Sequence, residues 1–391
     1  MSEYQYYEFQ ALDRRLTAAE MARLRTFSTR ARITPTSFVN EYDYGDFGGD
    51  ENTWMDEYFD AFLYFANWGT RIFSLRLPSR LLDLQTAELY CVGESASARE
   101  HKGNTILTLN SEEEEAEWPE EQDALSALIP IRTQLSGGDL RALYIAWLLS
   151  AQTGELDDEV LEPTVPPGLG ELDGSLERLV DFLRLDPHLL EVAAATSPPL
   201  HVQALTPDAI RTWIAGQPTA DKDAWLEHFI AANDPALTTE LQRLIAGRTA
   251  AAPASGDPRT AGALRLAAEE ARDERRRANA AQAEADRKRR EHEAAVARSK
   301  YLADLARRQP AVWTEIETLI ATKQPANYDR AVSLLVDLRD AAAAYGGDSE
   351  FLARFQAPCA RTMSASRRCS RKWNVRVWVD GRGTLASYPA M

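Results

Sequence analysis

The chain has few residues that could form disulfides or bind transition metals. It contains three Cys in 391 residues, and two of them, Cys359 and Cys369, lie in a terminal stretch whose pattern differs from the rest. The remaining thiol, Cys91, follows Tyr90 in a segment that looks packed, so a core thiol is favoured over a nucleophile. One Cys excludes a disulfide framework and a Cys-based zinc site, and it fits a reducing cytoplasm.

Histidine is equally sparse, and no His has the H-x-x-x-H or H-E-x-x-H spacing that places two zinc ligands on one helix face. The five are His101, His188, His201, His228 and His292. Motifs for covalent or nucleotide chemistry are also missing, since there is no G-x-S-x-G elbow, no P-loop and no G-x-G-x-x-G. We therefore expect no cofactor and no catalytic residue.

Long apolar runs and positive charge are lacking too. No stretch approaches the ~20 apolar residues of a membrane span, and MSEYQYYEFQ does not begin like a signal peptide. The net charge is −16 and the pI is about 4.9. A negative surface repels phosphate and anionic membranes, so we expect a cytoplasmic protein without direct nucleic-acid binding. The richness in Ala and Arg suggests a GC-rich bacterial genome.

The N-terminal part alternates between strand and helix signals and predicts a small α+β domain over 1–153 that ends in helices. Thr17-x-x-Glu20 is a capping box that opens a helix. A stripe of large apolar residues from Leu140 to Leu148 predicts a buried helix. The other expected elements are strands at Tyr4–Leu12, Arg32–Tyr42, Arg71–Leu77 and Ile106–Leu109, and a helix over Glu51–Trp68.

Beyond this domain the pattern is helical. An acidic loop occupies Ser111–Asp123, and a Pro-rich acidic linker follows at 154–170. Short amphipathic helices over 171–248 predict a second, all-helical core. Its expected members are Leu176, Leu179, Leu183, Leu190, Trp213, Trp225 and Phe229. An Ala/Pro/Ser/Gly linker at 249–260 ends this part. The expected fold class is therefore α+β, with mostly helical domains after the first.

A long charged helix is predicted over 261–309. The segment is full of Ala, Glu and Arg, which are strong helix formers, and pairs such as Glu284/Lys288 have the favourable acid-first spacing. Large apolar residues are nearly absent between Leu266 and Val296, so a strong coiled-coil seam is not expected. We interpret the segment as a solvated spacer, before a small helical module over 310–357.

The last stretch, 358–391, does not continue this pattern. When it is back-translated with GC-favouring codons and read from the third base of the Pro358 codon, one allowed reading is LRADHVRKPSLLEKVERAGLG. That string would complete the preceding helix and add a turn and a last short helix. We therefore predict that the stretch is a frame-shifted tail, irregular in structure, and we give Cys359, Cys369 and the basic run Arg367–Lys372 no functional weight.

The densest polar cluster is DYGDFGGDE. Its carboxylates at Asp43, Asp46, Asp50 and Glu51 are separated by Gly and could wrap a calcium or magnesium ion. The spacing does not match a calcium-binding loop, and the same composition suits an exposed turn before an acidic helix N-terminus. The cluster is a weak metal-site candidate, and with it a divalent-cation-dependent hydrolase or nuclease is the least favoured function.

Aromatic residues are concentrated near the N-terminus, and most should be core. The outer ones, Tyr6, Tyr42, Tyr44 and Phe47, are candidates for a protein-binding surface on an acidic domain, because Tyr and Trp are favoured at interface hot spots. Arg275–Arg277 and Arg287–Arg290 on the long helix are interleaved with Glu and Asp, which favours a solvated face over a nucleic-acid contact.

Two resemblances accompany these patterns. YQYYEFQALDRRLTAAEMARLRTFSTRARITPTSFVNEYDYGDF, with ANWGTR and VPPGLGEL, resembles an uncharacterised bacterial protein family over most of residues 1–200. WTEIETLIATKQPANYDRAVSLLVDLRD and the restored KPSLLEKVERAGL resemble the helical module at the end of many bacterial SWIM zinc-finger proteins. The C-x-C…C-x-H motif of SWIM proteins is absent here, so the resemblance implies no metal or DNA-binding residue, only a shared partner or genomic setting.

Together these observations predict a non-catalytic cytoplasmic adaptor that binds another protein. The alternative is an accessory subunit of a SWIM-associated nucleic-acid or phage-defence system, with a SWIM zinc-finger protein as partner. Neither the pathway nor the oligomeric state follows from the sequence.

Overall fold

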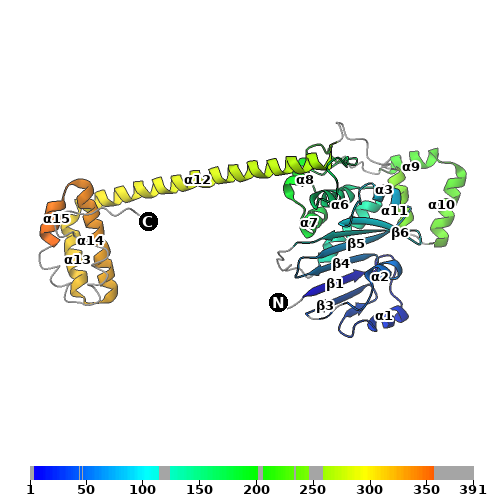
Figure 1. Ribbon diagram of the computed structural model, residues 1–391, viewed down its shortest axis with the longest axis horizontal. Coiled ribbons are helices and arrows are strands. Elements are labelled where there is room, and N and C mark those ends of the chain that lie inside the picture. The colour runs from blue at the N-terminus through cyan, green and yellow to red at the C-terminus, as the bar shows by residue number, and fades with distance from the viewer. Residues whose placement is uncertain are drawn as a thin grey trace. The chain divides into compact units, whose positions relative to one another are not determined.

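The computed structural model describes residues 4–43, 45, 47–113, 124–200, 206–232, 235–245 and 259–355. The chain divides into two compact units, Met1–Arg276 and Arg277–Met391. The first combines a seven-stranded sheet with helices, and the described part of the second is helical (Figure 1). The α+β class expected from the sequence is confirmed.

The sheet of the first unit has the strand order β2-β3-β1-β4-β5-β7-β6, and all of these neighbours pair in antiparallel fashion. The strands are β1 (Gln5–Gln10), β2 (Arg32–Thr34), β3 (Ser37–Tyr42), β4 (Ala61–Ala66), β5 (Arg71–Pro78), β6 (Ala96–His101) and β7 (Asn104–Ser111). The turn between β4 and β5 requires a glycine, because Gly69 has a φ of +109° and a Cβ there would lie 1.7 Å from the carbonyl oxygen of Glu113.

Strand β4 lies at the centre of the sheet and is buried on both faces. Ala61, Leu63 and Phe65 belong to the core on one face, and Phe62, Tyr64 and Ala66 to the core on the other. The prediction of one helix over Glu51–Trp68 is therefore wrong. Helix α2 (Glu51–Glu57) is short, and the chain then enters β4. A strand buried on both faces has apolar residues at every position, so its sequence lacks the alternation that would identify it.

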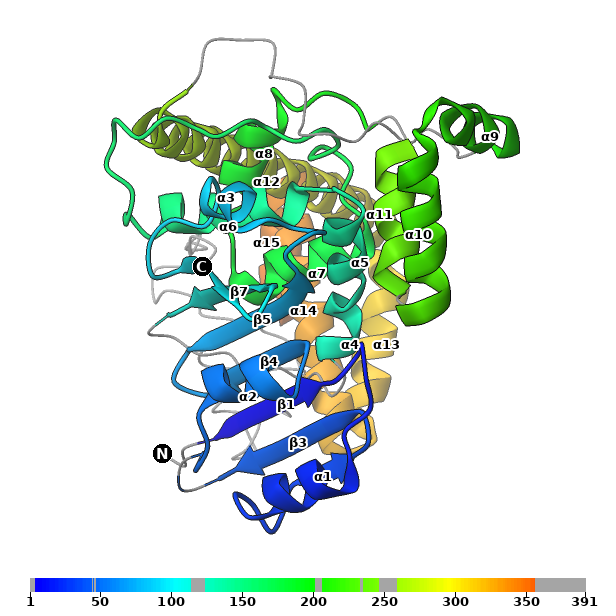
Figure 2. The same ribbon diagram turned by 90° about the vertical axis from the view of Figure 1, so that its right-hand side faces the viewer.

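One face of the sheet is covered by α1 (Ala18–Arg25) and α2, which lie on the same side in Figure 2. Leu24 of α1 and Trp54 of α2 pack there in one core with Phe9 of β1. The predicted capping box is confirmed at the start of α1. Glu20 N–H donates to Thr17 Oγ1 at 3.2 Å, and Thr17 N–H donates to the Glu20 carboxylate at 2.7 Å.

The other face carries a larger helical layer. Its helices are α3 (Leu84–Glu88), α4 (Ala124–Leu128), α5 (Pro130–Ser136), α6 (Arg141–Gln152), α7 (Gly174–Leu183) and α8 (Pro187–Ala194). The predicted buried helix is α6, in which every residue from Arg141 to Ala151 is buried. Leu179 and Leu183 of α7 share one core with Phe73 of β5. Helices α7 and α8 therefore do not form the separate helical core that was expected, and Val165 and Leu169 of the Pro-rich 154–170 stretch are buried in the same core.

Three further helices belong to the first unit: α9 (Pro207–Gly216), α10 (Thr219–Ala232) and α11 (Pro235–Ile245). They differ from the expectation of a buried core. No residue of α9 is buried. Trp213 and Trp225 stack on each other at a centroid distance of 5.3 Å and are half-buried, whereas the side chain of Phe229 is 59% exposed.

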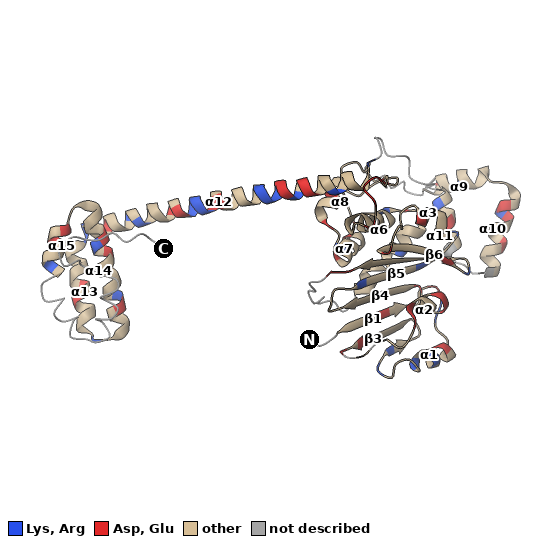
Figure 3. Ribbon diagram, viewed as in Figure 1, with Lys and Arg blue, Asp and Glu red and all other residues tan. Residues whose placement is uncertain are grey.

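Helix α12 (Ala261–Arg307) is continuous over 47 residues, with Lys and Arg alternating with Asp and Glu along it (Figure 3). Glu269, Arg276 and Arg287 are exposed, as a solvated helix requires. Its first turns differ from that description, because Ala261 and Leu264 are buried in the core of the first unit.

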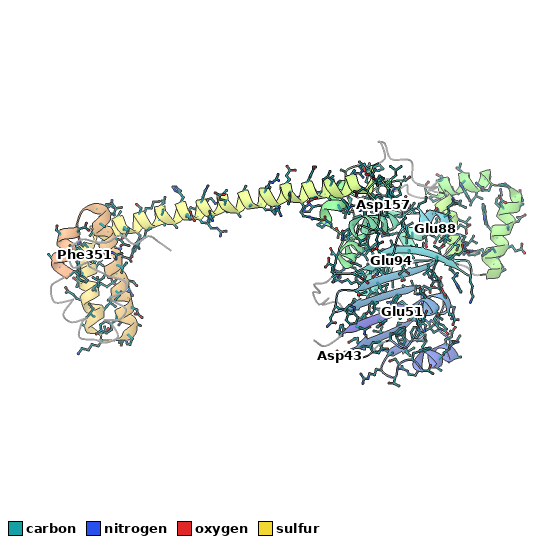
Figure 4. The ribbon with its side chains drawn as sticks, in the orientation of Figure 1. Asp43, Glu51, Glu88, Glu94, Asp157 and Phe351 are labelled. Atoms are coloured by element: carbon teal, nitrogen blue, oxygen red, sulfur yellow. The ribbon has the colours of Figure 1, made fainter. Side chains whose placement is uncertain are left out.

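The second unit contains α13 (Gln309–Ala321), α14 (Pro325–Tyr345) and α15 (Asp348–Phe355). Its core includes Trp313, Leu335 and Phe351, with Leu305 from the end of α12 (Figure 4 labels Phe351). The predicted tail 358–391 lies outside the described residues, so the frame-shift remains a prediction. Among the described helices, none combines the length and apolar character that crossing a membrane requires.

Candidate interaction surfaces

The acidic residues proposed as a cation site form no metal-binding group in the part of the chain that the structure describes. Asp50 is the N-cap of α2, where Oδ1 accepts from Thr53 N–H at 2.6 Å. Asp43 follows β3 and is exposed, and it lies apart from Glu51 at the start of α2 (Figure 4). Burial raises the pKa of the Glu51 carboxyl above its ordinary value. Asp46 lies outside the described residues, and within the described ranges no three His, Cys, Asp or Glu residues form a metal-binding group.

The candidate aromatic surface is largely part of the core. Tyr6 is only 5% exposed, stacks on Phe65 at a centroid distance of 4.9 Å and donates its hydroxyl to Glu8 at 3.0 Å. It therefore cannot contribute to an exposed surface. Tyr42 and Phe47 are half-buried and pack against Tyr7 at 5.7 and 4.8 Å between ring centroids. Tyr44 lies outside the described residues.

Cys91 is buried, and two of the His residues lie beside carboxylates. Cys91 is 8% exposed, and burial raises the pKa of its thiol to about 12. Its thiolate form, which nucleophilic attack requires, is therefore suppressed. His101 lies 3.6 Å from Asp56, and His188 lies 3.7 Å from Glu191 on α8.

A cleft between α7 and α8, with the loop before α7, is the first of two surfaces that suit a partner. It has a volume of about 560 Å³ and an apolar floor with acidic side chains at its rim. The floor is formed by Leu169, Leu172, Val180, Leu190 and Ala194, and the carboxylates belong to Glu177, Asp181 and Glu191. All three acidic residues are exposed, whereas Val180 and Leu190 are half-buried.

Helix capping and side-chain contacts set the geometry of this cleft. Asp173 caps α7, Asp186 caps α8, and Arg184 ends α7 in the left-handed region with a φ of 55°. Gln152 of α6 clamps the short turn between the helices. Its Nε2 donates to Arg184 O at 3.0 Å, and its Oε1 accepts from Asp186 N–H at 2.6 Å. The two helices are therefore held in a preformed arrangement.

The second surface is an apolar ridge on α10, which we define as Leu226, Phe229 and Ile230. These side chains are 59%, 59% and 74% exposed. On a helix the spacing i, i+3, i+4 places them on one face. Isolated apolar residues on a surface are ordinary, whereas a group of them on one helix face is a candidate interaction site.

The charge of the first unit sets the chemistry of both surfaces. Residues 1–276 contain 47 Asp and Glu against 24 Lys and Arg, a net charge of −23. Glu88, Glu94 and Asp157 are further exposed acidic residues of this unit (labelled in Figure 4). The sequence analysis did not predict either surface, because it assigned apolar residues of α7, α8 and α10 to a helical core. The sequence does contain one indication of the cleft, because Val180 is an apolar residue among charged residues on the outer face of α7.

Comparison with protein-family models, with curated proteins and with solved structures finds no match to this chain. The two surfaces are therefore interpreted from their own chemistry.

Proposed function

We propose that this protein is a non-catalytic adaptor whose first unit binds a basic partner protein. The observation that carries the proposal is the exposure of the α10 ridge. Leu226, Phe229 and Ile230 expose more than half of their side-chain surface to water. Burying such side chains against a partner stabilises a complex by about 25 cal/mol per Å² of apolar surface, before the cost of association.

Charge supports a heterologous partner over a second copy of this chain. Asp221, Asp223 and Glu227 accompany the ridge on α10, with Lys222 as the only Lys or Arg of that helix. Two copies of a unit with a net charge of −23 would bring like charges together, which costs free energy at an interface. A basic surface with apolar residues complements both features of the ridge.

The division into two units supports the description as an adaptor. Each unit has its own hydrophobic core, and α12 continues from one into the other without a break in the helix. In a chain of this kind each unit can fold independently, and each can carry a binding site of its own.

The proposal is tested by affinity capture from the native host followed by mass spectrometry, with two matched variants. Phe229→Glu with Ile230→Glu places two charges on the ridge. Ala220→Glu with Ala224→Glu adds the same two charges to the same helix, at exposed positions on its opposite face.

We expect one protein with a basic surface to be retained by the wild type and by the Ala variant, and to be lost with the ridge variant. Circular dichroism of all three proteins should agree, since both variants change only exposed positions. Equal capture by the ridge variant and the wild type would contradict the proposal.

A further inference from the structure

The cleft between α7 and α8 has the features of a helix-binding groove. Two helices form its walls, apolar side chains form its floor, and carboxylates stand on its rim. Grooves of this kind bind an amphipathic helix through apolar residues that recur at i, i+3, i+4 and i+7. We infer that the cleft binds an amphipathic helix of the partner that carries Lys or Arg beside its apolar stripe.

Charge complementarity selects this occupant. Glu177 and Asp181 lie one helical turn apart on α7, so their carboxylates face the same side of the helix. Glu191 stands on α8. A basic residue next to an apolar anchor can reach these carboxylates while the anchor contacts Val180 or Leu190. An acidic helix would meet repulsion at each of these points.

The chain already docks one Arg-bearing helix beside α8 in this way. Arg272 of α12 forms an ion pair with Asp186, and Arg275 lies 3.5 Å from Glu191. Among the described residues, Glu177 and Asp181 form no ion pair of this kind, and both line the α7 side of the cleft. A second basic helix would contact α7 with the same chemistry that α12 uses on α8.

Gly170 is a position at which a larger side chain can be introduced to block the cleft. Gly170 lines it, and a Cβ built there meets no atom within 4 Å. Gly174 also has open space around its Cβ but does not line the cleft. Neither glycine has a positive φ that a side chain would strain. Gly170→Trp therefore places a bulky side chain at the lining of the cleft, where it should hinder entry of a helix, and Gly174→Trp is its matched control.

The binding experiment uses the full chain and a fluorescent peptide of about 18 Leu and Lys residues, arranged as an amphipathic helix. A scrambled peptide of identical composition reports binding by charge alone. Fluorescence anisotropy should show tighter binding of the amphipathic peptide, and Gly170→Trp should weaken that binding by about ten-fold. Gly174→Trp should leave it within about two-fold of the wild type.

A second pair of variants tests whether the peptide is attracted by the carboxylates at the cleft or only by the negative charge of the whole chain. Glu177→Gln with Asp181→Asn removes two charges from the cleft, and Glu269→Gln with Glu270→Gln removes two from the exposed face of α12. The first should weaken binding of the amphipathic peptide by about five-fold at physiological salt, and the second by less than about two-fold.

Equal affinities for the two Trp variants, or equal losses for the two charge variants, would overturn the inference. It rests on the proposed function only in requiring a basic partner, and its failure is distinguishable. Loss of the captured partner with the α10 ridge variant, together with unchanged peptide binding by Gly170→Trp, would leave the adaptor function standing and remove the cleft from it.

Discussion

Glu162 and Arg259 form a two-pronged ion pair at the point where the chain enters α12. Arg259 Nε donates to Glu162 Oε2 at 2.8 Å, and Nη2 donates to Oε1 at 2.7 Å. Tyr144 of α6 donates its hydroxyl to the same carboxylate. The Glu162 side chain is only 4% exposed, so these donors offset the cost of removing its carboxylate from water. The pair therefore joins the start of α12 to the core of the first unit.

Replacing Arg259 should destabilise the first unit strongly. Arg259→Met leaves the buried Glu162 carboxylate without its cation, and breaking such a pair costs about 3–5 kcal/mol. Guanidinium unfolding followed by tryptophan fluorescence measures the loss. Arg211→Met is the control, because Arg211 and Asp208 are 75% and 89% exposed and such a pair contributes about 1 kcal/mol or less. If Arg259→Met and Arg211→Met lower the free energy of unfolding equally, the buried Glu162–Arg259 pair stabilises the protein no more than an exposed pair does.

Local signals were sufficient to predict several parts of this fold. The Thr17/Glu20 capping box, the buried helix α6 and the continuous helix α12 follow from short-range spacing and propensity, and all three are present. These features depend on residues within a few turns of one another, so a single sequence contains the information.

The features that were missed depend on contacts between distant segments. Phe62 and Phe65 face opposite sides of the sheet, which is decided by the strands beside β4 and not by β4 itself. The apolar residues of α7 read as a separate core until their packing on β5 is known. The cleft needs both α7 and α8 and the turn that Gln152 holds, and no periodicity in either helix encodes that arrangement.

Divalent cations should not bind at the acidic turn before α2. Asp50 is engaged as a helix cap, Asp43 follows the end of β3, and Glu51 is the first residue of α2. Calorimetric titration with calcium, magnesium and manganese should give no binding heat, and thermal unfolding should not shift with any of them. A saturable heat that disappears in Asp43→Asn with Asp50→Asn would restore the metal-dependent hydrolase or nuclease as a candidate.

The Cys91 thiol should resist modification in the native protein. Burial raises its pKa to about 12, so only about one thiol in ten thousand is ionised at pH 8. The experiment uses Cys359→Ser with Cys369→Ser, which leaves Cys91 as the only thiol, and an aromatic disulfide reagent. We expect negligible labelling in buffer and one thiol per chain in guanidinium. Rapid labelling in buffer would show that Cys91 is accessible.

Glu20 should make the stability of the first unit depend on pH in the acidic range. Hydrogen bonds from the Arg14 guanidinium and from the Thr17 N–H lower the pKa of Glu20 from its ordinary 4.5 to about 2. Because the folded pKa is the lower one, the carboxylate stabilises the fold fully above pH 4.5, and this contribution disappears as the pH falls to about 2.

Glu20→Gln removes this titration and the ion pair with Arg14, whereas the Gln amide oxygen can still accept from Thr17 N–H in the capping box. At neutral pH the variant should be less stable than the wild type by about 0.5–1 kcal/mol, because the ion pair with Arg14 is lost, and the difference should shrink steadily as the pH falls from 4.5 to 2. Urea unfolding at a series of pH values measures it. Glu269→Gln, at an exposed position on α12, is the control for a Glu-to-Gln change elsewhere in the chain. A difference between wild type and Glu20→Gln that stays constant across this range would mean that the Arg14 and Thr17 hydrogen bonds do not favour the charged form of Glu20.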